Sequence, residues 1–166
     1  MQGDGLARRD ARRARPRAGE GVRALRREEA IGEPFRHRLR VRYHECDPQG
    51  VVFNANYLAY FDIALTELWR DAVGGYASLA DGGLDVVVAE ARITYLAPLH
   101  FDEEFEVMLW FEELGSTSMR CGLRIERDGT EIADGELRHV LIELASGEKT
   151  AIPDELRRSL SRYRRE

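Results

Sequence analysis

One short stretch, residues 43–61, contains the residue types that attack on an activated carbonyl requires. Its acid, Asp47, precedes Pro48 and is followed by Gly50, where the backbone can approach a ligand closely. Asn54 follows a few residues later, where a long helix is expected to begin. A carboxylate beside the positive end of a helix can activate a nucleophile, and backbone N–H groups there can hold an oxyanion. The stretch therefore offers chemistry at a carbonyl carbon, although an Asp on a loop before a proline is by itself more often a turn former.

The helix behind this loop is predicted to begin at Asn56, a favoured N-cap residue, and to end at Gly74 and Gly75. Most of its remaining positions are also apolar, so the fold is expected to surround it on most sides. Its apolar stripe has spacings of three and four residues and comprises Leu58, Phe61, Leu65, Leu68 and Ala72.

Alternating patterns predict the sheet. In residues 35–43 apolar side chains and a packed His37 alternate with four arginines, which indicates a half-buried strand with a solvated arginine face. Residues 76–83 are expected to form a loop, and the tail after Ile152 a short helix with Pro153 near its first turn. Further strands are predicted at residues 85–96, 104–114, 116–127 and 131–144.

The strand at residues 85–96 is expected to bury one face and to contain a bulge near Ala89, where the alternation changes phase. One strand, a long helix and four strands with short connections predict an α+β fold, in which an antiparallel sheet packs on one buried helix. The side chains expected to be buried in residues 85–96 are Val86, Val88, Ala91, Ile93 and Tyr95.

The run ECDPQGVVFNANYLAYF, residues 45–61, resembles the signature of hotdog-fold acyl-CoA thioesterases of the 4-hydroxybenzoyl-CoA thioesterase family. In that family an acid-x-Asp-x-x-Gly-Val-Val-aromatic loop precedes a Tyr-containing helix. A weaker resemblance extends over about residues 35–145. It implies a hotdog fold, with a five-stranded antiparallel sheet around one long central helix. It also implies dimers that join two sheets, with active sites at the interface.

The resemblance further implies hydrolysis of an acyl-CoA to the free acid and CoA. Asp47 would act as general base or as nucleophile, and the sequence leaves both open. Glu45 either tunes Asp47 by like-charge repulsion or faces solvent. Family members often have His or Tyr at the position of Asn54, so the backbone N–H of Asn54 is the group carried over. The predicted site comprises Asp47 and Asn54 as catalytic residues, Gly50, Val51, Val52, Phe53 and Tyr57 as oxyanion or substrate contacts, and Arg92 and Arg120 as CoA contacts.

Two other functions stay open. A hotdog hydratase or dehydratase acting on acyl thioesters would pair a His with a carboxylate on the central helix; Glu67 offers the acid, but the loop has Asp47 where a His is wanted. A non-catalytic acyl-CoA sensor would need a regulatory module, and the first thirty residues lack helix-turn-helix periodicity. A Gly-x-Ser-x-Gly elbow, a P-loop and a dinucleotide fingerprint are absent from the sequence, and its histidines lack metal-ligand spacing. No cofactor or metal is therefore expected.

Charge divides the 166-residue chain into two parts. Residues 1–30 hold nine arginines against five acids, whereas the whole chain has a net charge of −5. Few apolar side chains and no aromatic ring occur there, so residues 1–32 are predicted to be a disordered basic extension and residues 33–166 the hotdog thioesterase domain.

The sequence shows neither the pattern of a secretory signal nor that of a membrane span. No apolar h-region follows the Arg-Arg pairs, and no run of eighteen apolar residues predicts a membrane span. Cys46 and Cys121 give no metal spacing, which favours a reduced, cytoplasmic protein. The resemblance implies a homodimer or homotetramer that acts on acyl-CoA, and the sequence gives no reason to expect binding to nucleic acid.

Overall fold

The computed structural model describes residues 32–165, so the predicted extension at residues 1–32 lies outside the described residues except for Gly32. No helix within the described part is long and apolar enough to cross a membrane. The elements are β1 (Phe35–Arg40), the 3₁₀ helix η1 (Tyr43–Glu45), α1 (Asn56–Val73), α2 (Tyr76–Asp81), β2 (Leu84–Tyr95), β3 (Glu104–Leu114), β4 (Ser118–Arg127), β5 (Thr130–Glu143) and α3 (Asp154–Ser161).

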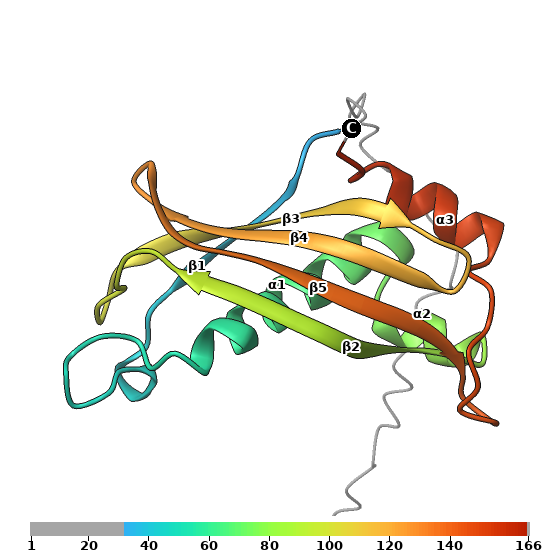
Figure 1. Ribbon diagram of the computed structural model, residues 1–166, viewed down its shortest axis with the longest axis horizontal. Coiled ribbons are helices and arrows are strands. Elements are labelled where there is room, and N and C mark those ends of the chain that lie inside the picture. Colours follow the sequence, from blue (N-terminus) through green and yellow to red (C-terminus); the bar gives the residue numbers. More distant parts are fainter. Residues whose placement is uncertain (1–31, 166) are drawn as a thin grey trace, which may run out of the picture.

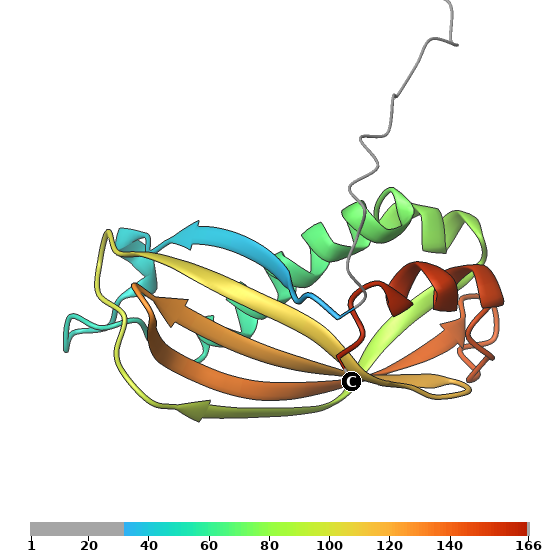
Figure 2. The same cartoon turned by 90° about the horizontal axis from the view of Figure 1, so that it is seen from above.

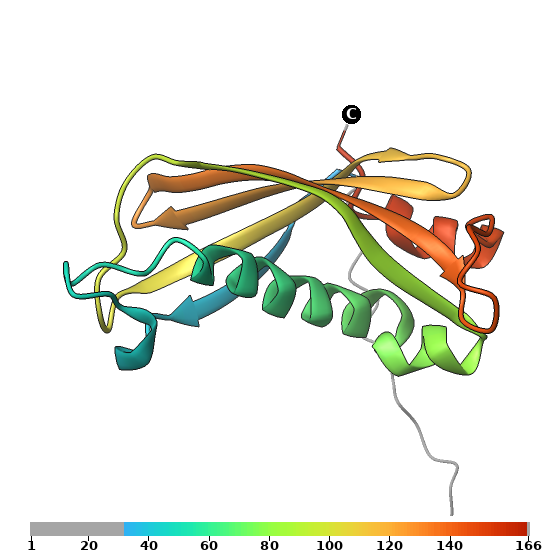
Figure 3. The same cartoon turned by 60° about the horizontal axis from the view of Figure 1, so that its bottom comes forward.

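The five strands form one curved antiparallel sheet in the spatial order β1-β3-β4-β5-β2. The long helix α1 runs along its concave side (Figures 1 and 3). Seen from above, α1 and α2 lie on the same side of the sheet (Figure 2). The predicted α+β class, with a five-stranded antiparallel sheet around one long helix, is confirmed.

Alternation along β1 gives the sheet its buried and solvated faces. Phe35 and Leu39 pack against the core, whereas the arginines between them point outward. Arg36 and Arg38 contact the same carboxylate, that of Glu106, at 3.2 and 3.4 Å. These exposed ion pairs stabilise the fold by little, because solvent screens them. The predicted solvated arginine row is confirmed.

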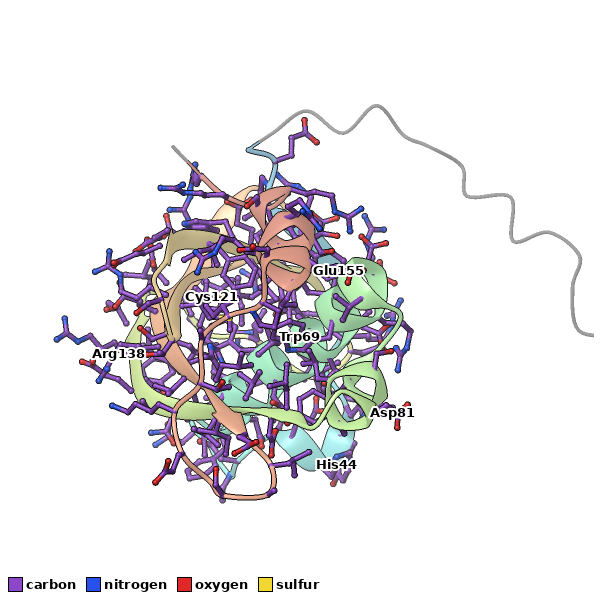
Figure 4. All side chains as sticks on the ribbon, turned by 90° about the vertical axis from the view of Figure 1, so that its right-hand side faces the viewer. His44, Trp69, Asp81, Cys121, Arg138 and Glu155 are labelled. Carbon is purple, nitrogen blue, oxygen red and sulfur yellow. The ribbon has the colours of Figure 1, made fainter. Side chains whose placement is uncertain are left out.

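The core lies between α1 and the concave face of the sheet. In Figure 4, Trp69 of α1 and Cys121 of β4 lie in the interior, whereas Arg138 of β5 points away from it. Burying each large apolar side chain here contributes roughly 1.5–3 kcal/mol to folding. The buried residues of α1 are Tyr57, Tyr60, Phe61, Ala64, Leu65, Leu68 and Trp69; those of β3 and β4 that face them include Val107, Leu109, Phe111, Met119, Leu123 and Ile125.

The predicted start of α1 near Asn56 is confirmed, but Asn56 is not the N-cap residue. Ala55 occupies the N-cap position, and Asn56 is the first helical residue. The Asn56 side chain does not cap the helix; its Nδ2 donates a hydrogen bond to the backbone oxygen of Glu45, at 2.7 Å. Leu58 was predicted in the buried stripe but is 44% exposed, because its face of α1 points toward the uncovered edge of the sheet. Gly74 ends the helix with a φ of 83°, as predicted.

That uncovered edge is β2. Its register shifts between Val88 and Glu90, so the predicted bulge near Ala89 is confirmed. Burial was predicted wrongly: Val88 and Tyr95 are 57% and 49% exposed, and Ala91 is also exposed. The pattern is that of a half-buried strand, but β2 pairs only with β5 among the described strands, and no described element covers its inner face completely.

Residues 76–83 were predicted to be a loop, and this is wrong because they contain the short helix α2. Six residues are too few for a helix that is stable alone. Leu79 is buried in the core, so tertiary packing holds α2 in place. The predicted C-terminal helix is present as α3, with Pro153 at its N-cap position.

Candidate active site

A tight turn presents Asp47 at the start of the site. Its backbone oxygen accepts the Gly50 N–H at 2.9 Å, and its Oδ1 accepts the Gln49 N–H at 2.8 Å. Gly50 has a φ of 78°, in the left-handed region that favours glycine. A Cβ there would contact nothing within 4 Å, so backbone conformation, and not close packing, explains this glycine. The turn fixes one carboxylate oxygen of Asp47, and no described residue bonds to the other.

Glu45 anchors this loop to α1. Its carboxylate is 8% exposed and accepts hydrogen bonds from the Arg42 N–H, at 2.7 Å, and the Tyr60 hydroxyl, at 2.6 Å. Burial and then the bond to Glu45 raise the pKa of Tyr60 well above its ordinary value. The Glu45 backbone oxygen accepts the Phe53 N–H at 2.9 Å. Glu45 therefore does not face solvent, the alternative left open by the sequence; it joins the two ends of the loop to the helix.

A pocket of about 490 Å³ opens beside the loop and brings most of the predicted site residues together. Tyr57 lies at its inner wall, with its ring centroid 5.1 Å from that of Tyr95. Burial raises the pKa of the Tyr57 phenol, so this ring stays neutral near neutral pH. The predicted residues that line the pocket are Asp47, Val51, Val52, Phe53, Asn54 and Tyr57; Gly50, Arg92 and Arg120 do not line it.

The end of β2 and the segment after it form the opposite wall. This wall was missed, because nothing in the sequence shows which strand end lies beside the start of α1. Tyr95 Oη donates a hydrogen bond to the Asn54 backbone oxygen, at 3.1 Å, which ties this wall to the helix start. The missed lining residues are Gln49, Tyr95, Leu96, Ala97 and Pro98.

Some of the backbone N–H groups predicted to bind an oxyanion already have hydrogen-bond partners within the fold. The Val52 N–H donates to the Leu99 oxygen at 2.8 Å and the Phe53 N–H to the Glu45 oxygen at 2.9 Å, so both are already used. The N–H groups of Val51, Asn54 and Ala55 have no partner among residues 32–165. Asn54 and Ala55 immediately precede α1, where the helix dipole favours negative charge. Val51 and Asn54 line the pocket with Asp47, so the Asn54 N–H, with that of Ala55 next to it, is the donor at the helix start best placed to bind an oxyanion.

The predicted CoA-binding arginines lie away from this pocket. Arg92 and Arg120 pair with Glu90 and Glu113, at 3.3 and 3.5 Å. Arg120 is directly opposite Arg138 across β4 and β5, so two positive charges do lie side by side on the convex face. Their assignment to CoA stays a prediction.

A larger pocket, of about 590 Å³, lies on the other flank of α1, against β1. It is lined partly by Arg40, which pairs with Asp102 and Glu104, and by Glu45, whose carboxylate is bonded to Tyr60. Asp47 does not line it. Volume alone would favour this pocket, but the chemistry available favours the smaller one, which contains the loop carboxylate and the start of α1.

The acid proposed for a hydratase is not organised for that role. Glu67 pairs with Arg70 one turn along α1, and this bond lowers the pKa of the Glu67 carboxyl. Glu67 lines neither of the two pockets described above.

His139 was not singled out by the sequence, yet it is the most unusual titratable side chain of the fold. It lies on the inner face of β5, between Met119 and Val88 in the register, and is 2% exposed. Neither ring nitrogen has a hydrogen-bond partner in the described part of the chain. Burial lowers the pKa of its imidazole to about 4, although Asp62 acts in the opposite direction.

This burial predicts a pH-dependent stability. An unfolded His has a pKa near 6.5. Because the pKa of His139 is lower in the folded than in the unfolded protein, protonation favours the unfolded state. The free energy of unfolding therefore has its full value above about pH 6.5 and decreases as the pH falls toward 4, by up to roughly 3 kcal/mol. Urea unfolding at steps from pH 7.5 to 4.5 should show this loss in the wild type and a shallower one in His139→Leu. Equal pH slopes in the two proteins would show that His139 is not the group that titrates.

This architecture, one curved antiparallel sheet around a long helix, is that of a hotdog fold. Residues 41–160 match the thioesterase-like superfamily, and the chain belongs to it. The acyl-CoA thioester hydrolase YbgC of Escherichia coli is 28% identical over 120 residues, which cover 72% of this chain and 90% of YbgC.

Two solved structures have the same fold as this chain. A hypothetical protein of Aquifex aeolicus, AQ1494, is 33% identical with a TM-score of 0.73, over 76% of this chain and 99% of that one. TT1821 of Thermus thermophilus is 32% identical with a TM-score of 0.72, over 77% and 98%.

Proposed function

We propose that the protein is an acyl-CoA thioesterase that hydrolyses an acyl-CoA to the free acid and CoA at the loop before α1. The observation that carries this proposal is the position of Asp47, which shares one pocket with Asn54, whose backbone N–H has no partner among residues 32–165. Membership of the thioesterase-like superfamily and similarity to an acyl-CoA thioester hydrolase support the substrate class.

The chemistry needs few groups, because a thioester carbonyl is already more reactive than that of an oxygen ester. In the general-base route, the free oxygen of Asp47 takes a proton from water while the water oxygen bonds to the acyl carbon. The Asn54 and Ala55 N–H groups hold the oxyanion, each contributing roughly 3 kcal/mol. The carbon–sulfur bond then breaks, and the CoA thiolate receives the proton from Asp47. In the alternative route Asp47 attacks the acyl carbon directly, and the carbon–sulfur bond breaks to release the CoA thiolate and leave an anhydride. Water then hydrolyses the anhydride to the free acid and the Asp47 carboxylate, and the thiolate takes the proton that is released.

The active unit in this proposal is a homodimer or homotetramer. β2 is a twelve-residue edge strand with exposed apolar side chains, and such an edge favours pairing with another chain. A second copy on this edge would cover Val88 and Tyr95 and close one side of the pocket. The free cysteines Cys46 and Cys121 are consistent with a reducing, cytoplasmic location.

CoA itself carries several phosphate charges, and the chain is net acidic. We infer that Arg92 and Arg120 contribute to a local basic cluster, in which Arg138 supports Arg120 from the neighbouring strand.

A product assay separates this function from hydration. The protein would receive saturated and 2-enoyl acyl-CoAs of the same length, and mass spectrometry would follow the products. We expect free acid and CoA from both, with no 3-hydroxyacyl-CoA. Formation of the hydroxyacyl-CoA without thiol release would replace the thioesterase proposal by a hydratase.

A further inference from the structure

The flank of α1 that holds the proposed active site has a second cavity, of about 230 Å³, further along the helix. Asn54 borders the active-site pocket just before α1 begins. Leu58, Asp62 and Thr66 follow at spacings of four and form one stripe of α1. The lining residues are Asp62, Leu65, Thr66 and Trp69 of α1, Tyr76 of α2, Val86 and Val88 of β2, and His139 of β5.

The surface between the two cavities is apolar. Leu58 on α1 is exposed and lies between the loop and the second cavity along the helix, and the exposed Val88 on β2 lines that cavity itself. The rise of an α-helix places Thr66 about 14 Å beyond Tyr57. An extended acyl chain that starts at Asp47 would therefore run over apolar side chains and reach the second cavity with its far end.

His139 brings buried polar atoms without hydrogen-bond partners to this cavity. The side chain is almost fully buried, and both of its ring nitrogens lack partners among the described residues. A buried polar group without a partner is costly, so such groups are normally satisfied by protein, water or ligand. Tyr76 is already bonded to Asp85, so it does not satisfy His139.

The polar groups around the cavity select the chemistry of a ligand. A neutral imidazole donates from one nitrogen and accepts at the other, and the Thr66 hydroxyl does both. The Asp62 carboxylate accepts hydrogen bonds and repels a second carboxylate. A hydroxyl group matches this set, because it both donates and accepts and carries no charge.

We propose that this second cavity is a specificity site, in which His139 binds a hydroxyl group on the distal part of the acyl chain. The inference rests on the proposed thioesterase function and names its substrate class. The low pKa of His139 supports it, because the ring stays neutral near neutral pH and keeps one acceptor nitrogen.

The test compares matched substrates. A series of saturated acyl-CoAs of increasing length and their ω-hydroxy counterparts would be hydrolysed by the wild type, His139→Leu and His139→Gln. At one chain length the wild type should prefer the hydroxylated substrate by about tenfold or more in kcat/KM. His139→Leu should lose this preference while hydrolysing the saturated substrate at least as well, and His139→Gln should retain part of it.

Two results would overturn the inference. One is a wild type without preference for the hydroxyl at any length. The other is a His139→Leu variant whose rates fall equally for both series, which would mean that His139 only supports the fold and that the cavity holds water or a side chain of a second copy.

A binding arm keeps this test separate from the proposed function. Calorimetric titration with free ω-hydroxy and unsubstituted fatty acids needs no catalysis, and the hydroxy acid should bind about tenfold tighter to the wild type than to His139→Leu. If no acyl-CoA is hydrolysed but this difference is present, the proposed function fails and the hydroxyl site stands. Equal binding of both acids by both proteins refutes the hydroxyl site whatever the activity.

Discussion

Asp47→Asn is expected to lower kcat for the best acyl-CoA by at least about a hundredfold, with a much smaller change in KM. The amide oxygen of Asn can still accept the Gln49 N–H, so the turn that presents residue 47 should form in the variant. What is lost is the second oxygen, which the reaction needs as base or nucleophile. A general base typically contributes a factor of 10² to 10⁴. Steady-state kinetics with a circular dichroism spectrum of each protein would measure the effect.

The matched control is Asn54→Ala, at the other side of the pocket. If the backbone N–H of Asn54 holds the oxyanion, removal of its side chain should cost far less than Asp47→Asn. A comparably large loss in Asn54→Ala would show that the amide side chain itself orients water or substrate. A folded Asp47→Asn variant with nearly wild-type kcat would remove Asp47 from the mechanism.

Val88→Glu is expected to dissociate the proposed homodimer and to abolish most of the proposed thioesterase activity. Val88 lies on the inner side of the unpaired edge strand and is largely exposed in one chain. Burying two symmetry-related carboxylates in a joined interface costs several kcal/mol, and each 1.4 kcal/mol weakens association tenfold. Sedimentation equilibrium should therefore show a dimer Kd raised about a hundredfold or more, together with a fall in kcat/KM at low protein concentration.

Val87→Glu provides the control one residue away. Successive residues of a strand point to opposite faces, so Val87 lies on the convex side of β2. The same charge there should leave the dimer intact; dissociation of a tetramer into dimers would identify that face as a second interface. A wild-type monomer with full activity would contradict the oligomer altogether.

Local patterns predicted the elements that carry a strong period. β3 has the bounds expected from residues 104–114, and its Phe105, Val107, Leu109 and Phe111 are buried as the alternation requires. The bulge in β2 could be found from a phase change alone. In these segments the periodic pattern of the strand or helix itself decides which face a residue lies on, so the local sequence is sufficient to predict the element and its buried face.

Long-range neighbours explain the errors. Leu58 and Val88 have the spacing of core residues, yet nothing in the spacing shows that their flank of the fold is uncovered. The sequence around Glu45 does not predict that its carboxylate accepts a hydrogen bond from Tyr60, fifteen residues later.

The candidate site was predictable in its loop and not beyond it. The motif placed Asp47 and Asn54 on one pocket, but the opposite wall at Tyr95 depends on sheet order. His139 could not be distinguished from other strand residues in the sequence, because its lack of hydrogen-bond partners becomes apparent only once β4, β5 and α1 are packed together.

The most direct test of the thioesterase proposal is thiol release from a panel of short, medium, long and aromatic acyl-CoAs, followed with a thiol-trapping dye. Wild type and Asp47→Asn would be purified in parallel, so that a contaminating thioesterase would appear equally in both. We expect rapid release from at least one acyl-CoA by the wild type and at least about a hundredfold slower release by the variant. Release at the uncatalysed rate from every substrate, or equal release by both proteins, would contradict it.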